Sequence, residues 1–268
     1  MEYDYRCIKV EKNAGLATLF MYWPDGIKKE PRTFHGEFSE ALWRIRHDDE
    51  VRVVVLRGAG DRYFLSHFPE EKSEESVVSR DRYYEIINNS SPSMIDTILR
   101  MPKPVIAMVN GDALGIGASI AFSCDIIIAA EDVFITDSHM AKHYWSSEAD
   151  IHEGTVAGDG GAVFWPLNMA LCVAKEHLML ARPTTAKELF EMHAINRAVP
   201  RDDLQKTVDE MVSLLLDRPA WALGWTKLAL NKRVIQNAEL TLHTSLALEL
   251  LAIDVRKNDT DGKGVRRI

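Results

Sequence analysis

The first part of the chain contains two patterns of apolar residues: short continuous runs, and single residues that recur at helical spacing. Five short apolar runs predict buried strands, over residues 16–22, 51–56, 104–109, 125–129 and 133–136. Between the first two runs, apolar residues recur at helical spacing at Phe38, Ala41, Leu42 and Ile45. An order of strand, helix and strand that continues in this way predicts an α/β core built in layers.

The pattern changes after Trp165, where helical spacing replaces the short apolar runs. The spacing predicts two helices within residues 168–194, a short strand over residues 195–199, and three more helices over residues 201–217, 219–233 and 238–257. We therefore expect an α/β core over residues 1–200, followed by a helical C-terminal region over residues 201–268.

Composition excludes several classes of protein. A chain of 268 residues with 46% hydrophobic content can bury a full core. The formal net charge is −8, and the basic residues form no stripe between aromatic residues, so no nucleic-acid partner is expected. Three cysteines without CxxC spacing indicate neither a disulfide framework nor a zinc cluster. No apolar run approaches the length of about 20 residues that spans a bilayer, and we expect a cytoplasmic protein without membrane contact.

Three short segments carry the candidate chemistry. Residues 110–117 (Asn-Gly-Asp-Ala-Leu-Gly-Ile-Gly) predict a strand that ends in a glycine turn and opens a helix. Such a turn directs backbone N–H groups at a negative charge, as an oxyanion hole does. Residues 137–139 (Asp-Ser-His) and 158–161 (Gly-Asp-Gly-Gly) add an imidazole and a carboxylate for proton transfer. Together the segments predict an enzyme that makes an enolate.

His139 is the candidate base of this site. An imidazole has an ordinary pKa of about 6.5, so it accepts a proton near neutral pH, and a carboxylate partner fixes its tautomer. We expect Asp159 to be that partner. The alternatives are a surface histidine, a histidine held by Asp137 two residues earlier, or a role for His152 in its place, and an Asp159 that only completes a turn.

Glu249 is a candidate of a different kind, because it lies on an apolar helical stripe. Leu242, Leu246 and Ile253 share its face at helical spacing. A charge on such a stripe is costly unless the carboxylate is paired or functional. Catalysis and a buried structural ion pair both remain open for this residue.

The order of these motifs resembles the crotonase (enoyl-CoA hydratase/isomerase) superfamily over nearly the whole chain. The matching segments are residues 104–117, 124–131, 186–188 and 196–199. The resemblance implies an α/β fold, a spiral of ββα repeats with a helical C-terminal region that trimerises, commonly as a dimer of trimers. It also implies that the backbone N–H groups of Phe68 and Ile116 form the oxyanion hole. His67 and Phe68 stand where the family usually has a small Gly-Ala-Asp turn, which predicts a narrowed pocket.

The acid and base positions depart from those of the hydratases in this family, which use two glutamates. The matching positions here hold Ser119 and His139, and a serine has no useful pKa near neutral pH. The pattern is similar instead to the β-diketone hydrolase branch, typified by 6-oxocamphor hydrolase. The residues that match this branch are His139, Asp159 and Trp165-Pro166, together with His35 and Glu249. A closely similar pattern also occurs in proteins labelled only as hydratase/isomerase family.

Two polar loops lie beside these motifs in the sequence. The segment 73–82 predicts either a mobile lid or a plain solvated face. The loop 140–157 is longer than in the β-diketone hydrolase branch and carries His143 and His152. We expect this loop either to close the pocket or to contact a neighbouring subunit.

The leading hypothesis is hydrolytic C–C bond cleavage (retro-Claisen) of a 1,3-dicarbonyl substrate. His139, oriented by Asp159, deprotonates water, Phe68 and Ile116 hold the enolate oxygen, and Glu249 or His35 positions water or returns the proton. No cofactor or metal is required, and the expected partners are a small-molecule substrate and further copies of the chain, as a homotrimer or dimer of trimers.

Two other functions stay open. The first is an enoyl-CoA hydratase, isomerase or ring-opening hydrolase, for which CoA is part of the substrate and basic residues are available at Lys28, Lys29, Lys257 and Arg266. The second is a non-catalytic family member that serves as an assembly scaffold.

Overall fold

The computed structural model describes residues 5–22, 34–65, 91–141 and 154–260. Several residues singled out above lie outside this part of the chain: His67, Phe68, the segment 73–82, His143, His152, Lys28, Lys29 and Arg266. The side chain of Lys257 is also outside it. The expectations for these residues therefore stay predictions.

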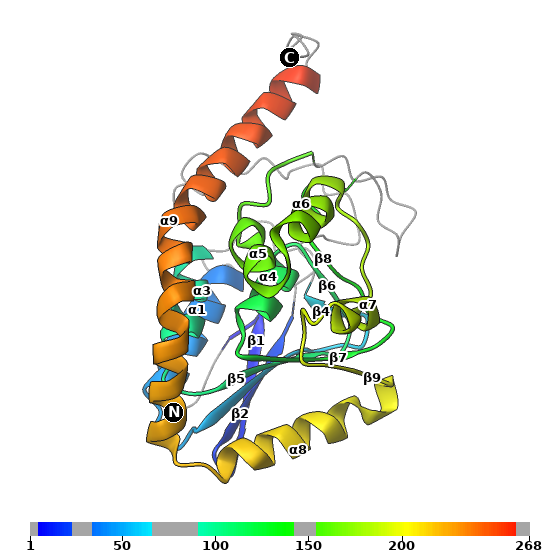
Figure 1. Cartoon of the computed structure of the whole chain (residues 1–268). Coiled ribbons are helices and arrows are strands. Elements are labelled where there is room, and N and C mark those ends of the chain that lie inside the picture. Colours follow the sequence, from blue (N-terminus) through cyan, green and yellow to red (C-terminus); the bar gives the residue numbers. More distant parts are fainter. Residues whose placement is uncertain (1–4, 23–33, 66–90, 142–153, 261–268) are drawn as a thin grey trace.

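A six-stranded sheet forms the centre of the molecule (Figure 1). Its order is β1 (Ile8–Asn13), β2 (Leu16–Met21), β3 (Val53–Gly58), β5 (Val105–Val109), β7 (Ile126–Ala130) and β9 (Arg197–Val199). β1 and β2 are antiparallel, and all other neighbours are parallel. Four of the five predicted apolar runs become strands of this sheet, β2, β3, β5 and β7. β5 is buried at every position, as expected of a parallel strand in a sheet that helices cover.

A second sheet of three strands lies beside the first and contains β4 (Tyr63–Leu65), β6 (Asp112–Leu114) and β8 (Ile135–Thr136). Consecutive strands alternate between the two sheets, so that β3 and β4, β5 and β6, and β7 and β8 each form one turn of a spiral. This arrangement confirms the expected spiral of ββα repeats. β6 is the strand predicted within residues 110–117, whereas β4 was not predicted, because its three residues are too few for a sequence pattern to indicate.

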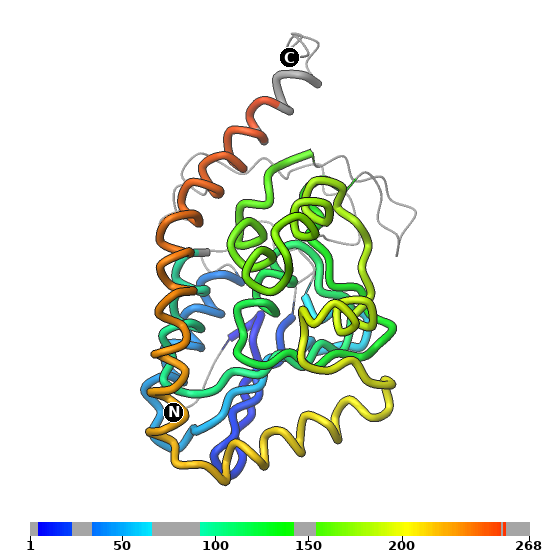
Figure 2. The backbone as a smooth tube through the Cα atoms, viewed as in Figure 1, coloured from blue at the N-terminus to red at the C-terminus, as the bar shows by residue number. Residues whose placement is uncertain are grey.

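Helices connect the repeats and cover the sheets. They are α1 (Phe34–Arg46), α3 (Ser91–Arg100), α4 (Ile116–Ser123), α5 (Gly161–Asn168), α6 (Leu171–Leu180), α7 (Ala186–Glu191), the 3-10 helix η2 (Arg201–Asp203), α8 (Leu204–Leu216) and α9 (Ala220–Thr260). α8 packs against β3, β5 and β7, and α9 runs along α3 and α5 (Figure 2). No helix in the described residues is long and apolar enough to cross a membrane.

The two helices predicted over residues 219–233 and 238–257 are one continuous helix, α9, which corrects the expected break. Ile235 and Ala238 are buried on the face toward the core, so packing continues through the supposed gap. The side chain of Asn237 also donates to the carbonyl of Arg233 at 3.0 Å and stays within the helix. The division of the chain at residue 200 stays a prediction.

Candidate active site

The glycine turn before α4 presents the first candidate group, the N–H of Ile116. Gly115 has a φ of 56°, which favours glycine, and its own N–H donates to the carbonyl of Thr136 at 3.0 Å. Ile116 is the first residue of α4, so its N–H has no carbonyl partner within the helix and is available to a ligand. The expected strand, turn and helix of residues 110–117 are therefore present.

The turn is held in place by contacts with two neighbouring strands. The side chain of Asn110 accepts from the N–H of Gly58 at 2.8 Å and donates to the carbonyl of Gly60 at 2.6 Å. At Gly117, a Cβ would lie 2.2 Å from the carbonyl oxygen of Leu65, so only glycine allows α4 to approach the end of β4. The chain continues from Leu65 toward Phe68, the second expected oxyanion donor, which is outside the described residues.

His139 is buried in the loop after β8, beside this turn. Asp137 Oδ1 accepts from His139 Nδ1 at 2.8 Å and from the backbone N–H of His139 at 3.1 Å. The hydrogen bond to Nδ1 therefore comes from Asp137, the alternative left open above, whereas Asp159 faces the other ring nitrogen and its role as the partner of His139 stays a prediction. The reason is local, because an aspartate two residues before a histidine reaches both its backbone and its ring. The same loop touches the turn, since a Cβ at Gly115 would lie 3.1 Å from Ser138 Oγ.

The other ring nitrogen of His139 faces two carboxylates from distant segments. Nε2 lies 3.8 Å from Asp159 Oδ2 and 3.7 Å from Glu249 Oε1. Asp159 comes from the turn before α5, and Glu249 comes from α9. Ser119, one helical turn after Ile116, donates its hydroxyl to Asp159 Oδ1 at 2.9 Å. We call Asp137, His139, Asp159 and Glu249 the His139 cluster.

The glycines around Asp159 let the other acids approach it. A Cβ at Gly158 would lie 2.3 Å from Glu249 Oε2, and one at Gly161 would lie 2.2 Å from Asp137 Oδ2. Either substitution would push a carboxylate out of the cluster. The missing side chains of the Gly-Asp-Gly-Gly motif therefore leave the space in which carboxylates from the β8 loop and α9 approach Asp159.

Burial and like charges set the protonation of the cluster. Burial by itself lowers the pKa of His139, but the Asp137 and Asp159 carboxylates outweigh it and raise this pKa well above the usual 6.5. Burial raises the pKa of Asp159 to about 7, which Glu249 and Asp137 reinforce, while the positive charge of His139 and the Ser119 hydrogen bond oppose it. Asp137 Oδ2 and Glu249 Oε2 are buried without a hydrogen-bond partner among the described residues. The cluster therefore retains protons at neutral pH.

The donor set also bears on metal binding. Asp137, His139 and Asp159 each place a ligand atom within 4.8 Å of the others. However, Asp137 Oδ1 and His139 Nδ1 are already bonded to each other, so the arrangement leaves Nε2 to face the remaining carboxylates. This geometry suits proton transfer, in which a histidine is oriented at one nitrogen and acts at the other.

His35, the remaining candidate, is buried on α1, with its ring 6.1 Å from that of Phe34. The catalytic role expected for His35 stays a prediction. Asp137 is the residue that the sequence analysis undervalued. Its Asp-X-His spacing was the available signal, but spacing does not tell which carboxylate reaches which ring nitrogen.

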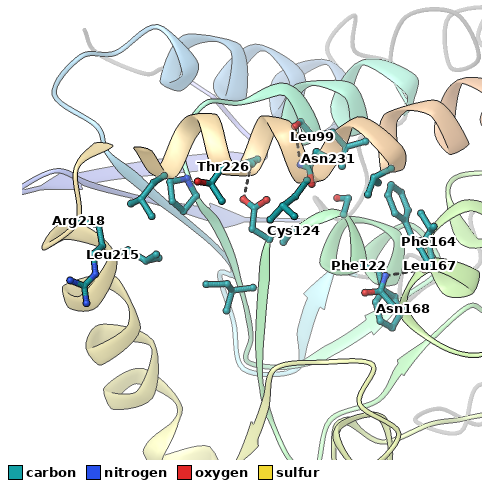
Figure 3. A pocket seen from close by; sticks show the side chains of 18 of the residues that line it. Leu99, Phe122, Cys124, Phe164, Leu167, Asn168, Leu215, Arg218, Thr226 and Asn231 are labelled. Carbon is teal, nitrogen blue, oxygen red and sulfur yellow. Dashed lines mark hydrogen bonds and ion pairs between the residues drawn. The ribbon is translucent and has the colours of Figure 1, made fainter. Parts of the chain in front are cut away.

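A cavity of about 470 Å³ lies elsewhere, between α9 and the ends of α4 and α5 (Figure 3). Its lining includes Phe122, Phe164, Leu167, Leu223 and Leu230, with the Asp125–Lys227 ion pair at its wall. None of the four residues of the His139 cluster lines it. The cavity is therefore separate from the candidate site.

A spiral of ββα repeats with a glycine turn at a helix N-terminus is the fold of the crotonase superfamily. The model of the enoyl-CoA hydratase/isomerase family matches residues 30–263, and the chain belongs to this family. The short-chain-enoyl-CoA hydratase of Clostridium acetobutylicum is 25% identical over 240 residues, which cover 90% of this chain and 85% of that protein. The 1,2-epoxyphenylacetyl-CoA isomerase of Escherichia coli is 26% identical over 247 residues, with coverage of 90% and 85%.

Among solved structures, a β-diketone hydrolase from the cyanobacterium Anabaena sp. PCC 7120 superimposes with a TM-score of 0.78 at 25% identity, covering 94% of this chain and 96% of that one. An enoyl-CoA hydratase from Mycobacterium avium subsp. paratuberculosis gives a TM-score of 0.76 at 22% identity, covering 93% and 91%, and shares the fold. These relatives are enzymes, and the chain is a crotonase-superfamily enzyme of the hydratase/isomerase type.

Proposed function

We propose that this enzyme hydrolyses a carbon–carbon bond of a 1,3-dicarbonyl compound. The observation that carries this proposal is the placement of His139, at a position where hydratases of the family hold a glutamate, against Asp159 and Glu249. The cluster is connected to α4 through Ser119, which donates to Asp159. Ser119 lies one helical turn after Ile116, whose N–H is the expected oxyanion donor. The structural likeness to a β-diketone hydrolase supports the same chemistry.

In the proposed reaction, water loses a proton to the His139 cluster and its oxygen bonds to one carbonyl carbon. The tetrahedral adduct collapses, the bond to the central carbon breaks, and its electron pair forms an enolate of the second carbonyl. The N–H of Ile116, and that of Phe68 in the predicted hole, hold the enolate oxygen, and a good donor of this kind contributes about 3–4 kcal/mol. A proton from the cluster then reaches the carbon, which leaves a carboxylic acid and a ketone.

The test is cleavage of cyclic and bicyclic 1,3-diketones, followed by mass spectrometry in heavy-oxygen water. We expect one labelled oxygen in the carboxylic acid product. His139→Asn should lower the rate about 10²–10⁴-fold, the range for loss of an acid–base group. The matched control is His243→Asn, on an exposed position of α9, which should retain the wild-type rate. Full activity of His139→Asn on a cleaved substrate would refute the assignment.

A CoA thioester is the second candidate substrate class, because relatives of this chain are named for enoyl-CoA hydration and for isomerisation of an epoxyphenylacetyl-CoA. The two carboxylates near His139 Nε2 resemble the pair that hydration of an enoyl thioester needs. Crotonyl-CoA hydration and calorimetric titration with CoA distinguish the two classes. Turnover of the thioester without cleavage of any diketone would favour this second function.

Self-association is part of the proposed function, as a homotrimer or a dimer of trimers. Exposed aromatic side chains lie together on α9, where Trp221 and Trp225 are 63% and 66% exposed and their ring centroids are 5.2 Å apart. A pair of exposed aromatic side chains on one helix face is typical of an interface between subunits. Light scattering coupled to size-exclusion chromatography measures the assembly, and a monomer at micromolar concentration would contradict it.

A further inference from the structure

The two positions that hold glutamates in hydratases of this family each contact a carboxylate from another segment. Ser119 donates to Asp159 Oδ1 at 2.9 Å, and His139 Nε2 lies 3.8 Å from Asp159 Oδ2 and 3.7 Å from Glu249 Oε1. The paired carboxylates missing from the sequence pattern are therefore present in space. One comes from the turn before α5 and the other from α9.

The acidic groups of this cluster outnumber its basic group. Asp137, Asp159 and Glu249 surround one imidazole, and no lysine or arginine forms an ion pair with any of the three within residues 5–22, 34–65, 91–141 and 154–260. A buried carboxylate without a partner costs several kcal/mol. The acids around His139 therefore keep its imidazole charged, while burial and the two neighbouring acids raise the pKa of Asp159. An imidazolium donates at both nitrogens and has no lone pair with which to remove a proton.

We propose that Asp159 is the base that takes the proton from water, and that His139 works as an imidazolium acid that gives a proton to the enolate carbon. The proposal rests on the function proposed above and reverses the role of His139 expected from the sequence. Asp137 is the positioning residue, because its carboxylate holds Nδ1 and leaves Nε2–H as the donor. Ser119 positions Asp159, because it occupies Oδ1 and leaves Oδ2 toward His139.

The proton balance closes within the cluster. The O–H bond of water breaks and its proton goes to Asp159, while the oxygen bonds to the carbonyl carbon. The C–C bond breaks toward the enolate, and the Nε2–H proton of His139 moves to carbon, which leaves a neutral imidazole. The proton on Asp159 then passes to Nε2, directly across the 3.8 Å gap or through Glu249. The cluster returns to its starting state without an oxidant, a reductant or a metal.

The electrostatics agree with these roles. Burial raises the pKa of Asp159 to about 7, which matches a general base that works near neutral pH. The acids around His139 overcome its burial and raise its pKa well above the usual value, which suits a proton donor. Among the described residues, the charged groups that face the ring are Asp137 from its own loop, Asp159 from the turn before α5 and Glu249 from α9.

The first test needs no substrate. In enzyme carrying ¹⁵N-labelled histidine, with His139→Asn used to assign the signal and exposed His243 as an internal reference, we expect both ring nitrogens of His139 to stay protonated at about pH 8. A neutral His139 ring at neutral pH would overturn the proposal. Because this readout is independent of turnover, it stays decisive even if no diketone is cleaved, an outcome that would refute only the proposed function.

The second test is the pH–rate profile of cleavage. Asp159→Asn should lower the rate about 10²–10⁴-fold, whereas Asp202→Asn on the exposed η2 should not. Ser119→Ala should move the acidic limb of the profile to higher pH, because the Ser119 hydrogen bond lowers the pKa of Asp159. If Ser119 had only a structural role, Ser119→Ala would change the rate without moving the acidic limb of the pH–rate profile. Retained activity of Asp159→Asn, or an unmoved limb in Ser119→Ala, would overturn the assignment.

Discussion

Two buried polar clusters in this protein differ in how their charges are balanced. Under α9, Lys227 Nζ lies 2.7 Å from Asp125 Oδ2, and the same oxygen accepts from the N–H of Val105 at 2.7 Å. Lys227 also donates to the carbonyl of Lys103 at 3.1 Å. This pair has one charge of each sign, and its groups have partners.

The His139 cluster is the opposite case, with three acids around one base. Two of its carboxylate oxygens, Asp137 Oδ2 and Glu249 Oε2, are buried without a hydrogen-bond partner in the part of the chain that the structure describes. A balanced pair stabilises one arrangement of the backbone, and an unbalanced cluster holds protons that it can transfer. We therefore expect the first cluster to stabilise the fold and the second to carry out the proposed proton transfers.

The largest expected effect on stability comes from removing the positive charge of the Asp125–Lys227 ion pair. Lys227→Met leaves Asp125, whose side chain is 19% exposed, without its cation and should lower the free energy of unfolding by about 2–3 kcal/mol. Urea unfolding measures the loss, and Lys232→Met, at an exposed position of the same helix, should stay within about 0.5 kcal/mol of the wild type.

Removing both charges distinguishes an unpaired charge from lost packing. The double variant Asp125→Asn with Lys227→Met should regain at least half of the loss, since no buried charge remains. If the double variant is less stable than Lys227→Met, the pair does not act through charge balance, and the comparison drawn above fails.

The second effect is a pH dependence that the His139 cluster imposes. The pKa of Asp159 is about 7 in the folded protein against an ordinary 3.8, so the folded state binds more protons between these values. Raising the pH through this window therefore lowers the free energy of unfolding, by a few kcal/mol at most. The raised pKa of His139 has the same sign and continues the decline above pH 6.5.

Chemical unfolding at a series of pH values tests this window. The difference between wild type and Asp159→Asn reports the titration of Asp159 together with its coupling to His139, because titrating groups outside the cluster cancel. We expect this difference to favour the variant increasingly up to about pH 7 and then to level off. A constant difference across the range would show that Asp159 has an ordinary pKa.

The smallest effect concerns Glu249, which completes the excess of acid. Glu249→Gln keeps the shape of the side chain but removes one like charge, so stability should rise by about 1 kcal/mol while cleavage slows. Thermal unfolding measures the gain, and Glu210→Gln on the exposed face of α8 should leave the midpoint unchanged. A loss of stability would indicate that Glu249 is an attractive partner of His139 and not a surplus charge.

The strands of the core were predictable because apolar runs such as residues 104–109 are buried on both faces and need no periodicity. β1 was missed because Lys9, Glu11 and Lys12 interrupt its pattern at the edge of the sheet. The prediction of a break within α9 was wrong for another reason. Helical propensity is local, whereas the burial of Ile235 and Ala238 against the core decides whether the helix continues.

The sequence by itself determined the order of the repeats, the glycine turn before Ile116, and the presence of His139, Asp159 and Glu249 among the candidates. These follow from apolar runs, glycine spacing and motifs, which act over a few residues. Only the tertiary structure decided which acid holds which nitrogen of His139. That choice depends on a meeting of the β8 loop, the turn before α5 and α9, and distances between segments so far apart in the chain are set by packing of the whole core.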